Sequence, residues 1–200
     1  MVKNLEELKK LFEMYDFVMK TSELAQENIS KSMIEKLINE GIIEKVRRGY
    51  YHWNYDFTGG DVVILKKLFP DAVYCMETAA FYYRYSDRTP THWNFAIHRD
   101  VSKTRTEIDY PFIKAYRVNS KLLHLGVRTF NIDGIDIKMY DRERTVCDCL
   151  RHMNEMDKEI FNKIIQAYVN DSQKNIPNLI KYAKILRVTK KVNDLIGVWL

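Results

Sequence analysis

The sequence predicts an α/β (α+β) fold with an N-terminal winged helix-turn-helix, followed by a mixed-sheet domain with a helical C-terminal half. Three observations predict it. Apolar residues recur at three- and four-residue spacing over residues 4–39, which indicates helices. Short alternating segments typical of strands occupy much of residues 42–140. From residue 141 onward the helical spacing returns and continues to residue 199.

The first part contains three predicted helices. Residues 4–15 form the first, with Asn4 as N-cap. Thr21 caps a short second helix that ends at Gln26. A third helix follows Ser30 or Ser32, either of which suits the cap, and Gly41 stands where a left-handed C-cap is expected. The three helices are therefore expected to be short and separated by tight turns.

A hairpin and a linker complete this part. Residues 42–53 are β-prone, with a basic tip and a glycine at the bend, and predict a two-stranded wing. Residues 54–60 contain Gly59-Gly60 and predict a linker. We therefore expect domains at residues 1–58 and 59–200.

The second part is expected to begin with helices at 61–69 and 78–85. Strands follow at 93–97 and 112–118. Two more, at 127–132 and 135–140, flank Asp133-Gly134, a strong hairpin signal. Four helices are then expected, at about 141–153, 157–169, 175–186 and 189–199, and Pro177 suits the first turn of the third.

Composition restricts the class of protein. Hydrophobic residues make up 46% of the 200-residue chain, enough for a packed core, and no apolar run is long enough to cross a membrane. The first seven residues have no apolar signal core and carry early acids, so we expect a cytoplasmic protein. Three cysteines without regular spacing favour reduced thiols. The net charge is +5, but residues 1–58 carry nine basic and ten acidic side chains, so charge alone is weak evidence for nucleic acid.

The third helix and the wing nevertheless indicate double-stranded DNA as the partner. A helix-turn-helix places its second helix in the major groove, and basic residues on a wing suit phosphates. An alternative is a solvated hairpin on a unit that binds protein or only fills space. The candidate DNA-binding residues are Ser30, Lys31, Ser32 and Lys36 of the third helix, and Lys45, Arg47, Arg48 and Tyr50 of the wing.

Several segments resemble the AbiEi-type antitoxins of type IV toxin–antitoxin and abortive-infection systems. In the first part these are Thr-Ser-Glu-Leu-Ala at 21–25, Ile-Ser-Lys at 29–31 and residues 37–51. In the second part they are Leu125-Gly126, residues 135–137 and Arg-Thr-Val-Cys-Asp-Cys-Leu-Arg at 144–151. The similar segments follow one another in the order found in that family and extend over nearly the whole chain.

This resemblance implies a transcriptional autorepressor that binds inverted repeats in its own promoter. It also implies an antitoxin that counters a nucleotidyltransferase-like toxin, without the need for a stable complex. The candidate antitoxin surface is Arg144, Asp148 and Arg151. Because Arg144 and Asp148 are four residues apart, an ion pair that fixes this helix to the sheet is the favoured alternative.

Other chemistry finds little support, and we expect no enzyme, no cofactor and no metal. Cys147 and Cys149 point in nearly opposite directions on a helix, so they cannot share an ion. Asp136-Ile137-Lys138, with Asp109 or Asp133, resembles the skeleton of a metal-dependent nuclease only weakly. Two competing functions therefore remain, a protein-interaction module that does not bind DNA and, less favoured, such a nuclease.

Overall fold

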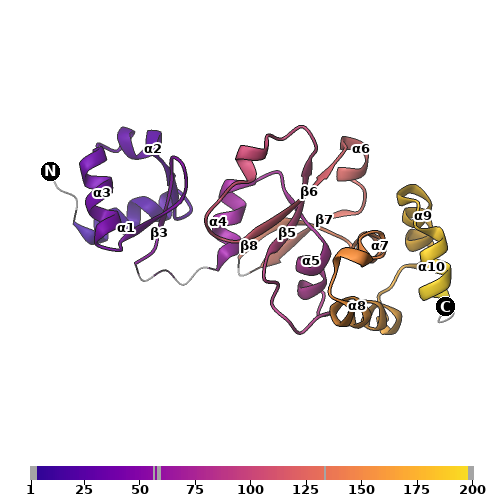
Figure 1. Ribbon diagram of the computed structural model, residues 1–200. Coiled ribbons are helices and arrows are strands. Elements are labelled where there is room, and N and C mark those ends of the chain that lie inside the picture. Colours follow the sequence, from indigo (N-terminus) through magenta and orange to yellow (C-terminus); the bar gives the residue numbers. More distant parts are fainter. Residues whose placement is uncertain (1–3, 56, 58–59, 133, 198–200) are drawn as a thin grey trace. The chain divides into compact units, whose positions relative to one another are not determined.

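The computed structural model describes residues 4–55, 57, 60–132 and 134–197. It shows an α+β protein with two separate sheets, as the sequence predicts (Figure 1). The chain forms two compact units. The first comprises Met1–Pro70 and Lys103–Phe112, and the second comprises Asp71–Ser102 and Ile113–Leu200. The division after Pro70 differs from the domain boundary expected at residue 58, since helix α4 (Asp61–Leu68) and a later segment belong to the first unit.

In the first unit, helices and a small sheet alternate along the chain. The sheet is antiparallel, with strand order β1-β3-β2, and β1 is a three-residue strand that the sequence analysis missed. The segment Lys103–Phe112 adds a 3₁₀ turn to this unit. The elements are α1 (Leu5–Met14), β1 (Val18–Lys20), α2 (Thr21–Gln26), α3 (Lys31–Asn39), β2 (Ile43–Arg47), β3 (Tyr50–Trp53), α4, and the turn η1 (Lys103–Thr106).

The apolar stripes of these helices close on one core. Phe12 of α1 and Trp53 of β3 are fully buried, and their ring centroids lie 5.5 Å apart. Leu24 of α2 and Leu37 of α3 are buried in the same cluster. Burying these side chains together stabilises the arrangement, because each short helix alone would be marginal in water.

Local sequence signals fix where these helices begin and end. Asn4 caps α1, and its side chain accepts a hydrogen bond from the Glu7 backbone N–H in a capping box. Ser30 caps α3, which decides between the two serines, and Gly41 has the expected left-handed φ of 69°. For α2 the prediction was wrong by one residue, because Lys20 is the N-cap and Thr21 lies inside the helix.

The second unit contains a mixed five-stranded sheet with order β6-β5-β4-β8-β7. Strands β5 and β6 are parallel, as are β4 and β8, whereas β4–β5 and β7–β8 are antiparallel. The strands are β4 (Val73–Tyr74), β5 (Trp93–His98), β6 (Ile113–Val118), β7 (Val127–Ile132) and β8 (Ile135–Tyr140).

The helices of this unit include α7, which lies at the centre of its core. Residues Glu143–Leu150 of α7 are all buried, and the helix packs against α5, α8, α9 and α10. Figure 1 shows α8, α9 and α10 on the side of α7 away from the sheet. The helical elements are α5 (Met76–Tyr82), α6 (Ser120–Leu123), α7 (Arg142–Arg151), η2 (Met153–Glu155), α8 (Lys158–Asn170), α9 (Ile176–Leu186) and α10 (Thr189–Leu195).

Most boundaries expected for this unit agree to within a few residues. The helix expected at 78–85 begins earlier, at Met76, and ends at Tyr82. The β7–β8 hairpin forms as expected, with Gly134 at a φ of 85°, although Asp133 lies outside the described residues. Two other expected segments also extend outside the described residues. They are residues 198 and 199 at the end of the last expected helix, and Asp56, Thr58 and Gly59 of the expected linker.

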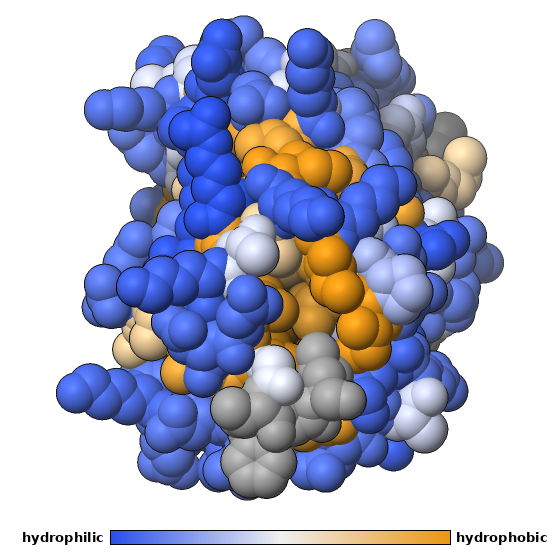
Figure 2. Space-filling model, turned by 90° about the vertical axis from the view of Figure 1, so that its right-hand side faces the viewer, coloured by the Kyte–Doolittle hydropathy of each residue, from blue (hydrophilic) through white to orange (hydrophobic). Residues whose placement is uncertain are grey.

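The outer helices of the second unit carry an apolar groove. Phe161, Ile165 and Val169 of α8 and Leu195 of α10 line a hollow of about 420 Å³. Figure 2 views the side that bears these helices and shows apolar side chains gathered in a hollow bordered by hydrophilic ones. Within the described part of the chain, no helix has the length and apolar character needed to span a membrane.

Candidate nucleic-acid interface

The start of α3 presents a polar, exposed surface. Ser30 accepts a hydrogen bond from the Met33 backbone N–H, and its hydroxyl lies 2.9 Å from that of Ser32. Lys31 is exposed and forms no hydrogen bond or ion pair with the described residues. Because Ile34 and Leu37 face the core, the helix can turn only this polar side outward.

Lys36 lies one turn further along the exposed side of α3. Its Nζ is 3.7 Å from Oε1 of Glu40, and both side chains are about half exposed. An exposed pair of this kind contributes little to stability and is easily exchanged for another partner. Lys36 can therefore leave Glu40 for a stronger acceptor.

The hairpin of β2 and β3 carries two free cations. Lys45 lies on β2, two residues before its end, and Arg48 lies in the turn. Both side chains are exposed and make no hydrogen bond or ion pair with the part of the chain that the structure describes. Gly49 adopts a φ of 78°, a conformation that favours glycine, and closes the turn. Its carbonyl accepts a hydrogen bond of 2.9 Å from the Thr21 backbone N–H, so the turn lies beside the start of α2.

Arg47 is fixed inside the unit. Its guanidinium stacks on the ring of Tyr50 at 3.9 Å, and Nη1 donates a hydrogen bond of 3.1 Å to the Arg105 backbone oxygen. The side chain is only partly exposed and also faces the Phe69 ring, at 5.9 Å. Arg47 and Tyr50, which the sequence predicted as contact residues, therefore also hold the hairpin in place.

Two basic regions near the hairpin were missed by the sequence analysis. Lys20, the N-cap of α2, lies 5.9 Å above the Tyr50 ring. The segment Lys103–Phe112 belongs to the first unit, and the Asp109 backbone N–H donates to the Val46 oxygen at 3.2 Å. This segment brings Lys103 and Arg105 into the unit that carries the hairpin. The position of Lys20 beside Tyr50 follows from the pairing of β1 with β3, and the sequence analysis did not recognise β1. No sequence signal indicates that Lys103–Phe112 packs in the first unit.

The residues predicted as an antitoxin surface fall into two groups. Arg144 and Asp148 are buried, with exposed fractions of 1% and 8%, and Arg144 Nε donates to Asp148 Oδ2 at 3.0 Å. Arg144 Nη1 also donates to the backbone oxygens of Leu122 and Leu125, at 2.6 and 3.0 Å. These contacts join α7 to the segment around α6, so this pair has the character of a structural clamp. Arg151 alone is exposed.

The electrostatics of the clamp follow from burial. Desolvation raises the pKa of Asp148 above its usual range, and the guanidinium of Arg144 opposes that shift. The Arg144 guanidinium also lies 4.1 Å from the centre of the Tyr140 ring. Gly126 packs directly against Arg144. A Cβ at this position would lie 2.8 Å from Arg144 Cβ, so the close approach of the two residues requires glycine.

Groups considered for other chemistry do not come together into a reactive centre. Cys147 and Cys149 are buried free thiols whose pKa values burial raises. Among the described residues, no group of three His, Cys, Asp or Glu side chains could hold a metal ion. Asp136 accepts a hydrogen bond from the Asn131 side chain at 2.8 Å in the exposed β7–β8 hairpin, while Asp109 belongs to the first unit and Asp133 lies outside the described residues.

Comparison with known proteins adds no relative. No family model matches this chain, and no curated protein was found to be similar to it. The functional interpretation therefore rests on the residues themselves and on their arrangement.

Proposed function

We propose that this protein is a DNA-binding transcriptional autorepressor whose first unit is a winged helix-turn-helix. The observation that carries the proposal is the set of exposed cations without side-chain partners, Lys31 at the start of α3, Lys45 on β2 and Arg48 in the hairpin turn. Phosphate neutralisation by such side chains supplies most of the affinity of a protein for DNA. The order helix, turn, helix and antiparallel hairpin supports the same class.

In this proposal α3 enters the major groove. Ser30, Lys31 and Ser32 contact phosphates and base edges at its start, and Lys36 exchanges Glu40 for the DNA. Lys45 and Arg48 contact the phosphate backbone beside it. Arg47 and Tyr50 act partly by positioning the turn, because their stacking fixes its direction.

The promoter of the protein's own operon is the proposed target, with inverted repeats as the binding site. Two copies then occupy one site, as the symmetry of an inverted repeat requires. Such a regulator works in the cytoplasm, where the DNA is. This part of the proposal extends the resemblance of residues 21–51 to the AbiEi-type antitoxins.

The second proposed activity is that of an antitoxin in a type IV system, acting against a nucleotidyltransferase-like toxin. Its support is the resemblance of residues 125–151 to that family. Of the three candidate residues, Arg151 is exposed and available to a partner, while Arg144 and Asp148 are positioning residues that hold α7. No catalytic role is assigned to this chain.

A footprinting experiment tests the repressor activity. Purified protein is incubated with the DNA upstream of its gene and with a shuffled fragment of the same length. We expect protection of an inverted repeat in the first fragment only, and loss of that protection in a Lys31→Ala/Ser32→Ala variant. A Lys181→Ala variant, which changes an exposed lysine of α9 in the second unit, is expected to protect as well as the wild type. No protection by the folded wild-type protein would refute the proposal.

Co-expression tests the antitoxin activity separately. The adjacent gene of the operon is induced with and without this protein, and growth is recorded. We expect rescue by the wild type and by the Lys31→Ala/Ser32→Ala variant, because the two activities use different units. If the neighbouring gene product is harmless, or if rescue fails, the antitoxin proposal is wrong while the repressor proposal stands.

A protein-interaction module without DNA binding is the second candidate. The groove of Phe161, Ile165, Val169 and Leu195 favours it, because apolar side chains in a surface hollow suit a protein partner. Affinity capture with the Ile165→Asp variant beside the wild type distinguishes the two. A partner that the variant loses, together with the absence of footprinting, would favour this candidate.

A further inference from the structure

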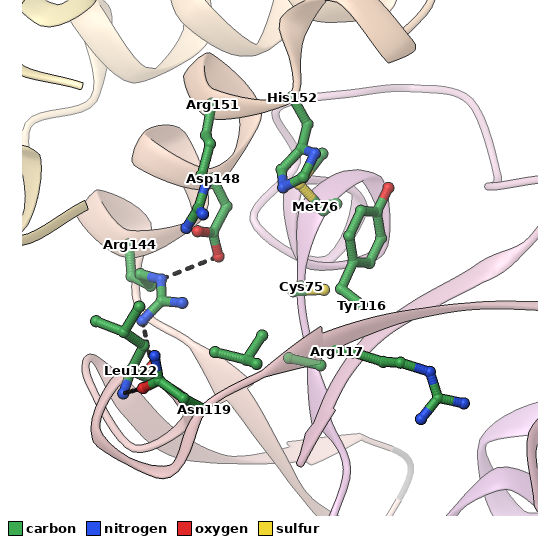
Figure 3. A pocket seen from close by; sticks show the side chains of 12 residues that line it. Cys75, Met76, Tyr116, Arg117, Asn119, Leu122, Arg144, Asp148, Arg151 and His152 are labelled. Carbon is green, nitrogen blue, oxygen red and sulfur yellow. Dashed lines mark hydrogen bonds and ion pairs between the residues drawn. The ribbon is translucent and has the colours of Figure 1, made fainter. Parts of the chain in front are cut away.

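A pocket in the second unit has not been assigned a role above. It has a volume of about 200 Å³ and lies between α7, α5, β6 and the segment before α6. Figure 3 shows Arg144, Asp148 and Arg151 lining one side, Tyr116 on the opposite side, and Met76 and Cys75 between them. All of these residues belong to the second unit.

Arg144 brings unused hydrogen-bond donors to this pocket. Its Nε donates to Asp148 and its Nη1 to Leu122 and Leu125, so three of its five N–H groups are occupied. The guanidinium also forms a side-chain hydrogen bond with Tyr140, and no hydrogen bond of Nη2 to another described residue is found. Figure 3 shows the nitrogen without a dashed line pointing toward the open middle of the pocket. A buried guanidinium that turns a nitrogen toward a pocket is a ready contact for an anionic oxygen.

Arg151 and His152 add a second set of donors. The Arg151 guanidinium is exposed and makes no hydrogen bond or ion pair with the described part of the chain. The His152 ring bonds Glu155 Oε1 through Nδ1 at 2.9 Å, which leaves its other nitrogen for a ligand. In Figure 3 this ring points toward Met76, and it packs on Tyr116 at 5.2 Å. Arg117 points away and donates to the Val101 backbone oxygen, so it is not part of this set.

The charges and the walls restrict the ligand. Arg144 and Asp148 neutralise each other at 3.0 Å, so Arg151 leaves one net positive charge beside the pocket. Most of the remaining lining is apolar or aromatic (Cys75, Met76, Ala96, Tyr116, Val118 and Leu122), and Asn119 and Arg117 add polar groups. A fork of guanidinium donors suits carboxylate and phosphate oxygens, and an apolar wall suits a small hydrocarbon or ring.

We propose that this pocket binds a small anionic metabolite that carries one oxyanion group, carboxylate or phosphate, on a compact apolar body. The oxyanion lies between Arg144 Nη2, Arg151 and His152, and the body contacts Tyr116 and Met76. The volume of about 200 Å³ is below that of a typical drug-sized site, so the ligand is small. Arg151 is also the side chain proposed above to contact a toxin, and binding of a small anion can be measured without DNA or toxin.

Calorimetry and NMR of the full chain test the proposal with four probes. These are benzoate, phenyl phosphate, inorganic phosphate and benzylamine. We expect saturable binding of benzoate or phenyl phosphate with a Kd below about 1 mM, weaker binding of inorganic phosphate, and none of benzylamine. Benzoate and phenyl phosphate distinguish a carboxylate from a phosphate ligand. The amide signals of Tyr116 and His152 are expected to shift.

Arg151 provides the decisive variant, because its exposed and unpaired side chain is not needed for folding. Arg151→Ala is expected to weaken binding by about tenfold or more, and Arg151→Lys by less. Arg128→Ala, which removes an exposed arginine that lines a different pocket, is expected to bind as the wild type does. The proposal is overturned if no probe binds, if the shifted signals lie elsewhere, or if Arg151→Ala binds with unchanged affinity.

Discussion

Arg144 joins α7 to the segment around α6, and replacing it with methionine removes three kinds of contact at once. The Asp148 carboxylate loses its cation, two backbone oxygens lose their donor, and the Tyr140 ring loses the guanidinium stacked on it. Methionine keeps an unbranched apolar stem of similar length, so the change tests mainly the polar contacts. We therefore expect the variant to fold with lower stability.

The magnitude follows from burial. Breaking a buried ion pair by removal of one partner costs about 3–5 kcal/mol, because the remaining charge stays without compensation. Asp148 lowers this cost by taking up a proton, since desolvation already raises its pKa. We expect a loss of about 3 kcal/mol, a large part of the roughly 5–15 kcal/mol that stabilises a domain of this size.

Urea unfolding followed by circular dichroism measures the loss, and amide hydrogen exchange of α7 assigns it to the second unit. The matched control is Arg151→Ala on the same helix, which removes an exposed arginine and is expected to change stability by less than about 0.5 kcal/mol. A double variant, Arg144→Met/Asp148→Leu, is expected to recover much of the loss, because no charge remains buried. A loss below about 1 kcal/mol for Arg144→Met, within the range of ordinary substitutions, would refute the clamp.

Three further predictions concern burial. Desolvation lowers the pKa of His52 to about 4. The His52 imidazole therefore stays neutral in the folded chain, whereas in the unfolded chain it takes up a proton below about pH 6.5. The free energy of unfolding should therefore fall by up to about 3 kcal/mol between pH 6.5 and 4, and urea titrations should show this dependence to be absent in His52→Gln. Gly126→Ala should cost more than about 1 kcal/mol in thermal unfolding, because φ is 76° and the new Cβ would lie 2.8 Å from Arg144 Cβ; an unchanged melting temperature would contradict this. Burial raises the pKa values of Cys75 and Cys149, so both should resist iodoacetamide at neutral pH until urea unfolds the chain, and fast labelling of the native protein would be the contrary result.

Strong local signals predicted much of the secondary structure. The helix α1 follows from apolar spacing and the Asn4 N-cap, and α3 from a serine cap, either Ser30 or Ser32, and Gly41. The β7–β8 hairpin follows from two alternating strands around Gly134. These features depend on contacts between residues close together in sequence, so they can be predicted without knowledge of the fold.

Contacts between distant segments could not be predicted in this way. Strands β1 and β4 are three and two residues long, too short to show alternation, and they exist because neighbouring strands pair with them. The segment Lys103–Phe112 joins the first unit through the Asp109 N–H to Val46, the Arg47 side chain to the Arg105 oxygen and the Tyr110 hydroxyl to Asp61. Each of these contacts joins residues far apart in the sequence.

The candidate site shows the same difference between local and long-range information. The pairing of Arg144 with Asp148 was anticipated as an alternative from their four-residue spacing, but that spacing is the same on an exposed and on a buried helix. The contact of Arg47 with the Arg105 backbone depends on a segment that is distant in sequence. The exposed Lys31, Lys45 and Arg48 were predictable because they lie at a helix start and on a short hairpin.

The salt dependence of DNA binding tests the central claim most directly. Affinity for the upstream DNA is measured by fluorescence anisotropy over a series of salt concentrations, for the wild type and Lys45→Ala/Arg48→Ala. The control is Lys181→Ala/Lys184→Ala, which removes the same charge from exposed positions of α9. If Lys45 and Arg48 contact phosphates, the slope of log K against log salt should decrease in magnitude by about 1.8 per bound copy in the first variant and stay unchanged in the control. Equal slopes for all three proteins, or salt-independent binding, would contradict the account.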